Sequence, residues 1–334
     1  MQTVVITGGS AGIGRAVAEI YAGRGDRVGL IARGEARLHE AADALQALGS
    51  SKAEIVPVDV VEDAEVDMAA EHFEQTLGPI DVWINAAMTT VYAPFVEMSA
   101  PEYERVTRVV YLGAVNGTRA ALQRMRPRQR GAIVNVGSGL AYRAIPLQSA
   151  YCGAKFAIRG FTEAIRAELI HDDLPISLSE VHLPGINTPQ FDWARNRMAR
   201  KPQPAPPIYE PEVAARAIVE AADRGVRELF VGTSTLKVLL GNMAVPGLLD
   251  RLLAASAYDA QQSGEDEPGG RPNNLFAPVP GHQGAQGRFA RGARVRGLVV
   301  RSGTLRGGAI GGGGLIALAI GVGLGALLRH QRLR

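Results

Sequence analysis

The sequence contains a single cysteine, Cys152, among 334 residues. One thiol excludes an internal disulfide framework and any zinc site built from several cysteines, and it is typical of a reducing compartment. We expect no metal site. At the N-terminus, residues 3–6 already have the Val/Ile composition of a buried strand, with no charged leader before them. We therefore expect no signal peptide and a cytoplasmic catalytic domain.

Acidic residues and lysine are both missing from residues 268–334, which hold ten of the 36 basic residues, all of them arginine. The first 267 residues hold all 33 acidic residues and the other 26 basic ones. A mildly acidic body followed by a basic tail indicates an anionic partner for the tail. The basic stretch is poor in the interleaved aromatic side chains on which bases stack. We therefore expect contact with anionic lipid and no nucleic acid.

Short apolar runs alternate with longer amphipathic stretches over about the first 230 residues. The short runs are rich in Val, Ile and Leu, and the stretches between them have helical periodicity. This alternation predicts an α/β fold of the Rossmann type, in which helices cover both faces of a doubly wound parallel sheet. The predicted strands are 3–6, 27–32, 53–58, 80–84, 131–136, 176–181 and 227–231, and the predicted helices are 12–23, 35–48, 62–77, 101–125, 150–171 and 211–223.

The composition changes after about residue 232, which predicts a C-terminal extension to a catalytic domain over 1–232. Residues 233–260 read as a helical extension, and 261–306 as an irregular Arg/Gly-rich linker. Residues 307–328 carry no charge and would span about 33 Å as a helix, which makes them a candidate transmembrane helix. Nine of these 22 residues are glycine, which weakens a helix, so a flexible or peripheral tail is the alternative.

A glycine-rich turn, Thr-Gly-Gly-Ser-Ala-Gly-Ile-Gly over residues 7–14, follows the first predicted strand and opens the first predicted helix. Glycine permits a sharp turn and a close backbone approach to a pyrophosphate. The helix N-terminus offers free N–H groups and the positive end of its dipole to the phosphates. The pattern predicts a dinucleotide site whose phosphate-binding residues are Gly8, Ser10, Gly12, Ile13 and Gly14.

Tyr151 and Lys155 stand four residues apart in a predicted helix, so their side chains lie on one helix face. A free tyrosine, with a pKa of about 10, exchanges protons poorly at neutral pH. A neighbouring lysine cation favours the phenolate and lowers the tyrosine pKa. The pair therefore predicts a proton-exchanging phenol, whereas a solvated helix face is the alternative for an isolated Tyr-x-x-x-Lys.

The turn at 7–14 and the Tyr-x-x-x-Lys at 151–155 together resemble the single-domain branch of the short-chain dehydrogenase/reductase family, over about residues 1–232. The resemblance implies hydride transfer between a nicotinamide cofactor and an alcohol or ketone. It assigns Ser138, thirteen residues before Tyr151, to hold the substrate oxygen, and Lys155 to bind the nicotinamide ribose as well. It also implies a homodimer or homotetramer formed through the helices at 101–125 and 150–171.

Arg33 follows the second predicted strand, whose tip carries no acidic residue. An acid at this position would bind the ribose hydroxyls of NAD, whereas a nearby arginine favours the 2′-phosphate of NADP. We therefore predict that NADP(H) is preferred over NAD(H). By resemblance, Asp59 contacts the adenine, with helix capping as the alternative. By the same resemblance, Asn85 and Ala86 line the cofactor in a degenerate form of the family motif.

The resemblance also places Pro184, Gly185 and Thr188 at the nicotinamide, with Thr188 on its carboxamide. Mainly apolar residues would surround the ring, which predicts a hydrophobic alcohol or ketone. These neighbours are Leu140, Tyr142, Leu147, Phe191 and Trp193. For Phe191 and Trp193, an equally good explanation is that they pack a lid helix. We interpret His171 and His182 as structural.

One residue departs from the family pattern. Many relatives carry an asparagine, which holds a water of the proton relay, where this chain has Val110, three residues before Gly113. Asn116 is nearby but out of register. Three explanations stay open: a relay by another route, slower turnover, or loss of redox chemistry. The last would make the protein a membrane-associated sensor or scaffold, and a dehydratase or isomerase of the same fold is a further alternative.

Overall fold

An eight-stranded sheet forms the centre of the molecule in the computed structural model, which describes residues 1–281 and 284–304. Its strand order is β14-β12-β7-β6-β4-β1-β2-β3, and all neighbours are parallel except β12 and β14. The chain order therefore reverses between β1 and β4, where a doubly wound sheet binds its ligand. The strands are β1 (Thr3–Thr7), β2 (Arg27–Ala32), β3 (Lys52–Pro57), β4 (Val82–Asn85), β6 (Gly131–Ser138), β7 (Ile176–Leu183), β12 (Glu228–Val231) and β14 (Val299–Arg301).

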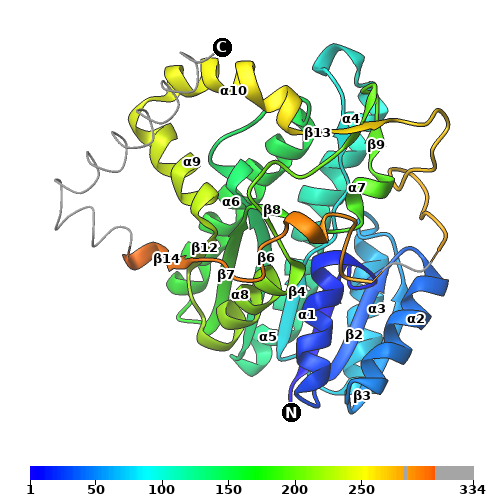
Figure 1. Cartoon of the computed structure of the whole chain (residues 1–334). Coiled ribbons are helices and arrows are strands. Elements are labelled where there is room, and N and C mark those ends of the chain that lie inside the picture. The colour runs from blue at the N-terminus through cyan, green and yellow to red at the C-terminus, as the bar shows by residue number, and fades with distance from the viewer. Residues whose placement is uncertain (282–283, 305–334) are drawn as a thin grey trace.

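Helices cover both faces of this sheet (Figure 1), so the Rossmann-type prediction is confirmed. Successive residues of β1 face opposite sides, as strand geometry requires. Val4 and Ile6 join the core under α1, α2 and α8, whereas Val5 joins the core under α3 and α5. The helices are α1 (Gly12–Gly23), α2 (Glu35–Ala47), α3 (Asp63–Leu77), α4 (Ala100–Thr107), α5 (Gly113–Met125), α6 (Ser149–His171) and α8 (Pro211–Arg224).

The predicted helix 101–125 is interrupted. A π-helical segment, Arg108–Leu112, separates α4 from α5. The two halves pack against different parts of the core, because Val106 of α4 lies in a cluster with α6 whereas Ala121 of α5 lies in the cluster with α3. The wider π turn changes which face of the helix is buried, and such turns are frequent at functional sites.

Beyond β12, the chain continues into α9 (Thr233–Ala244) and α10 (Pro246–Ala260), where the sequence predicts a helical extension. The expectation of an irregular linker over 261–306 was wrong in two places. A short strand, β13 (Gln262–Asp266), pairs with β10 (Arg200–Pro202), and β14 pairs with β12. Both strands form because an unpaired partner edge is available to them, which local composition does not reveal.

The candidate transmembrane helix at 307–328 lies outside the described residues. Within 1–281 and 284–304, no helix has the length and apolar character needed to cross a membrane. The expected homo-oligomer and the domain boundary at residue 232 stay predictions.

Candidate active site

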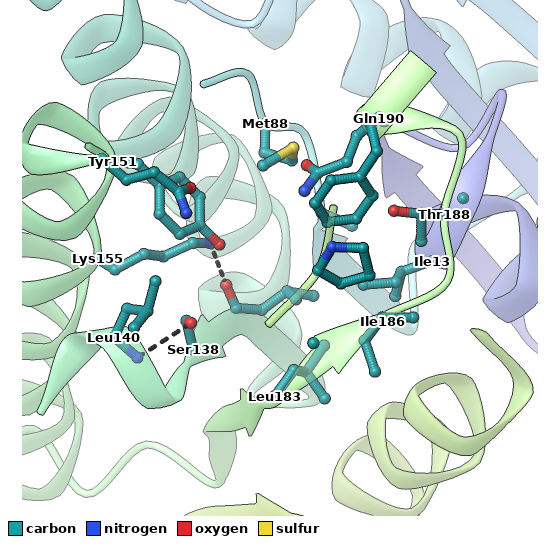
Figure 2. A pocket seen from close by; sticks show the side chains of 18 of the residues that line it. Ile13, Met88, Ser138, Leu140, Tyr151, Lys155, Leu183, Ile186, Thr188 and Gln190 are labelled. Atoms are coloured by element: carbon teal, nitrogen blue, oxygen red, sulfur yellow. Dashed lines mark hydrogen bonds between the residues drawn. The ribbon is translucent and has the colours of Figure 1, made fainter. Parts of the chain in front are cut away.

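A cavity of about 500 Å³ opens at the carboxyl ends of the central strands. It begins at the turn between β1 and α1, passes the ends of β4, β6 and β7, and reaches α10. Figure 2 shows Tyr151, Lys155 and Ser138 on one side of it and Ile13, Ile186 and Thr188 on the other. Residues that lie far apart in the sequence therefore meet along one continuous wall, as expected for this edge of a doubly wound sheet.

The glycine turn is shaped by close backbone approaches. A Cβ on Gly8 would lie 2.7 Å from Ala87 Cα, and one on Gly14 would lie 2.4 Å from the Gly8 carbonyl oxygen. Gly8 also has a φ of +72°, which disfavours other residues. α1 begins at Gly12, whose N–H donates a 3.1 Å hydrogen bond to the Gly284 carbonyl. All five predicted phosphate-binding residues line the cavity: Gly8, Ser10, Gly12, Ile13 and Gly14.

The three predicted catalytic residues meet at the middle of the cavity. Ser138 ends β6, and its hydroxyl accepts a hydrogen bond of 3.1 Å from the Leu140 N–H. Tyr151 and Lys155 come from the first turns of α6. The Lys155 Nζ lies 5.5 Å from the centre of the Tyr151 ring and donates a 2.6 Å hydrogen bond to the Val136 carbonyl (Figure 2).

Burial controls the protonation of this pair. It raises the pKa of Tyr151 well above the ordinary value, although the Ser138 hydroxyl opposes the shift. Burial also lowers the pKa of Lys155 to about 8, against the opposing charge of Glu180. The sequence predicts a tyrosine pKa lowered by the lysine. In the structure the burial of Tyr151 is the largest influence on its pKa and raises it instead. Tyr151 is therefore a neutral phenol, suited to donating a proton.

The far end of the cavity, beside β2, is positively charged. Arg33 lines it and donates to the backbone carbonyls of Asn274 and Leu275. Burial and the neighbouring Arg105 lower the pKa of Arg33, so an arriving anion would be favoured there. Arg37 lines the same end and stacks 4.6 Å above the Trp193 ring. The sequence prediction missed Arg37, although its four-residue spacing from Arg33 at the start of α2 was a usable signal.

Asp59 also lines this end, but its carboxylate is already engaged. It forms an ion pair with Arg105 and accepts a 3.3 Å hydrogen bond from the Val61 N–H. The hydrogen bond from Val61 closes a local turn before α3, so Asp59 does not cap that helix. The structure therefore places Asp59 in the cavity wall, where its carboxylate already accepts hydrogen bonds from neighbouring residues.

The Asn85 side chain is not part of the cavity wall, and the expectation that the backbone at this position lines the cofactor stays a prediction. The amide lies in the core, where it accepts a 2.8 Å hydrogen bond from Trp83 Nε1 and donates to Thr118 and Asn135. Buried amides need such partners, and β4, β6 and α5 supply them here. The neighbouring Ala86 does line the cavity.

Pro184, Gly185 and Thr188, which are expected at the nicotinamide, follow β7 and line the cavity. Of the predicted apolar neighbours, Leu140, Phe191 and Trp193 line the cavity. Tyr142 and Leu147 are not part of its wall. Tyr142 packs instead against His182, with ring centres 4.8 Å apart.

Val110 lies in the π-helical segment and is buried among aliphatic side chains. Asn116 cannot substitute for the missing amide, because its Nδ2 donates to the Val60 carbonyl at 2.9 Å, on the side of α3. The usual position for a relay asparagine is therefore apolar in this chain.

Comparison with known proteins agrees with this geometry. A family model described as short chain dehydrogenase matches residues 2–198. The chain is 34% identical to the uncharacterized oxidoreductase YxnA of Bacillus subtilis (strain 168), over 78% of this chain and 74% of that protein. It is 30% identical to a 3-dehydrosphinganine reductase of Danio rerio, over 66% and 68%. A crystal structure of levodione reductase matches with a TM-score of 0.54 at 26% identity, over 57% and 73%.

We expect Asn85→Ala to lower the free energy of unfolding by about 2 kcal/mol, because Trp83 and Asn135 lose a buried partner. Dinucleotide affinity of the folded variant should stay close to that of the parent. Urea unfolding and a fluorescence titration with NADPH measure the two effects. A large loss of affinity at unchanged stability would instead place the Asn85 amide on the cofactor.

Proposed function

The chain belongs to the short chain dehydrogenase family of NAD(P)-dependent oxidoreductases, and from this premise we propose that it reduces an apolar ketone with NADPH. The supporting observation is the single cavity that joins three chemically different parts. These are the glycine turn with Arg33 and Arg37 at one end, the Ser138–Tyr151–Lys155 group in the middle, and an apolar passage towards α10 at the other end.

The cofactor end fits a phosphorylated dinucleotide. The turn around Gly8 and Gly14 leaves room where a Cβ would collide with backbone, which lets a pyrophosphate approach the start of α1. Arg33, directly after β2, and Arg37, in the first turn of α2, would supply donors for a 2′-phosphate in place of the backbone carbonyls to which they donate here. The nearest acid, Asp59, is paired with Arg105 and would repel that phosphate less than a free carboxylate. These features support NADPH over NADH.

The central residues can carry out the proton chemistry of carbonyl reduction. A bound nicotinamide would supply the hydride. Ser138 would donate a hydrogen bond to the carbonyl oxygen, where negative charge develops. Tyr151, which burial keeps as a neutral phenol, would give its proton to that oxygen. Lys155, as the ammonium, would stabilise the phenolate as it forms.

The apolar passage supports a ketone that carries an extended hydrocarbon portion. It runs from the end of β7 to α9 and α10, where Ser234, Thr235, Ser256 and Gln261 lie among apolar residues. The similarity to a 3-dehydrosphinganine reductase agrees with a long-chain substrate. Its apolar walls are formed by Leu183, Ile186, Phe191, Val238, Leu253 and Ala257.

The cofactor preference is tested with Arg33→Glu and Arg37→Glu. Each should weaken NADPH binding at least tenfold, about 1.4 kcal/mol, and change NADH binding little, because only NADPH carries the 2′-phosphate. Fluorescence titration of the full chain measures both affinities, with Arg126→Glu, an exposed arginine paired with Asp172, as the control. Equal losses for both cofactors would contradict the preference.

Tyr151→Phe separates an enzyme from a nucleotide-binding sensor. With 3-dehydrosphinganine and NADPH, we expect the variant to lose turnover at least a hundredfold, because phenylalanine has no proton to donate. Its affinity for NADPH should remain within about threefold of the parent. NADPH oxidation followed at 340 nm gives the rate. A variant that turns over normally would remove Tyr151 from the reaction.

The pH dependence of reduction follows from Lys155. Because burial lowers its pKa to about 8, the ammonium is present below pH 8 and is lost as the pH rises through that value. We expect the rate of reduction to fall across this range. Lys155→Arg stays charged throughout, so any residual activity of this variant should not fall near pH 8. A parent profile that is flat to pH 10 would exclude the charged lysine from the step.

A further inference from the structure

A buried polar cluster lies beneath Lys155, between α6 and the sheet. Glu180 and His182 of β7 and Glu228 of β12 are at most 2% exposed. In register, Glu180 stands beside Asn135 and His182 beside Gly137, so both side chains leave the sheet on the face that α6 covers. Neither belongs to the cavity wall. The cluster comprises Tyr142, Lys155, Arg166, Glu180, His182 and Glu228.

Three polar atoms of this cluster have no hydrogen-bond partner within the described residues: Arg166 Nη1, Glu180 Oε1 and His182 Nδ1. The last two lie 3.7 Å apart. Both face Gly137. A Cβ on Gly137 would lie 2.8 Å from the Nδ1 and 2.9 Å from the Oε1. Buried polar atoms are costly to leave unpaired, and such a pair calls for a functional explanation.

The two unpaired atoms that face Gly137 lie close to the backbone that Lys155 contacts. The Nζ of Lys155 is bonded to the carbonyl of Val136, which belongs to the same peptide unit as the Gly137 nitrogen. Lys155 and Glu180 also influence each other's charge. Burial raises the pKa of Glu180, which brings it towards the value of about 8 for Lys155. Groups with similar pKa values exchange protons readily.

From His182 the cluster continues outwards. The second ring nitrogen, Nε2, lies 3.5 Å from the Tyr142 hydroxyl, which donates a 3.2 Å hydrogen bond to Glu228. Tyr142 is partly exposed, and the Arg159 guanidinium lies 4.1 Å above its ring. An imidazole can take up a proton at one nitrogen and release one from the other. His182 therefore connects the unpaired atoms to the surface.

On its other side Tyr151 belongs to a mainly apolar cluster, which also contains Tyr103 and Tyr111. Tyr151 packs there against an aliphatic cluster that includes Val106, Val110 and Ala154. Aliphatic side chains neither donate nor accept protons. The polar route from Lys155 therefore leads towards the sheet and away from the π-helical segment.

We propose that Glu180 and His182 form the proton relay that recharges Lys155 and, through it, Tyr151. This inference rests on the proposed function. In the direction of reduction, the Tyr151 phenol gives its proton to the carbonyl oxygen, and the Lys155 ammonium returns one to the phenolate. The Glu180 carboxyl or the His182 imidazolium then protonates the lysine amine, and water at Tyr142 restores the relay. No electrons move in these steps.

The test compares the first turnover with the later ones in the full chain, with NADPH and 3-dehydrosphinganine in rapid mixing. The first turnover uses the proton already on Tyr151, whereas every later one needs the relay. Glu180→Gln and His182→Gln should keep the first-turnover rate within about twofold and slow the steady-state rate at least tenfold. Ser179→Ala is the matched control, because this buried residue of β7 faces the other side of the sheet.

The relay proposal would be overturned if Glu180→Gln and His182→Gln kept the steady-state rate of the parent. It would also be overturned if their first and later turnovers slowed equally. Gly137→Ala, whose Cβ would displace both unpaired atoms, gives a second measurement if the charge variants do not fold, and it should show the same separation of rates. If the parent protein does not reduce the ketone, both the proposed function and the relay are contradicted. If the parent reduces it and the variants are unaffected, only the relay is contradicted.

Discussion

The position of every functional group depends on how closely the backbone of the first βα turn can approach its neighbours. Gly8 lies so near the Ala86–Ala87 backbone, and Gly14 so near the Gly8 carbonyl, that a Cβ at either position would collide with main-chain atoms. These contacts fix the start of α1 over the ends of β1 and β4. The start of α1 then lines the same cavity as Arg33, directly after β2, and Ser138 at the end of β6.

Burial, more than pairing, sets the chemistry of the central group. Tyr151 and Lys155 lie on one face of α6 with their reactive atoms enclosed, so desolvation favours the neutral form of each. The same helix separates two different environments. One is the aliphatic cluster around Val110, and the other is the polar cluster of Glu180 and His182 on the sheet. The proposed relay uses this asymmetry, since it runs through the polar environment and not through the position of Val110.

The sequence predicted the parallel strands well, because each is a nearly continuous apolar run with a clear end. It also singled out the glycine turn, Ser138, Tyr151 and Lys155, and the structure brings all of them to one cavity. The strand β14 could not be predicted, since it depends on the free edge of β12. For the same reason, no local pattern shows that Arg33 meets the backbone of Asn274, 241 positions later.

Asn85 and His182 show where residue-level interpretation failed or was incomplete. Asn85 ends a strand at the ligand-binding edge, yet its amide satisfies Trp83 and Asn135 in the core. His182 looked isolated in the sequence because its partners come from β12, from the segment after β6 and from the neighbouring position of β7. Contacts between strands decide both cases, and these appear only when the register is known.

A crystal structure of the full chain with NADP⁺ would test the central claim most directly. The account predicts the pyrophosphate at the start of α1, the 2′-phosphate beside Arg33 and Arg37, and the nicotinamide ring between Tyr151 and Thr188. A dinucleotide bound with its nicotinamide away from Tyr151 and Lys155, or with its 2′-phosphate away from both arginines, would contradict it.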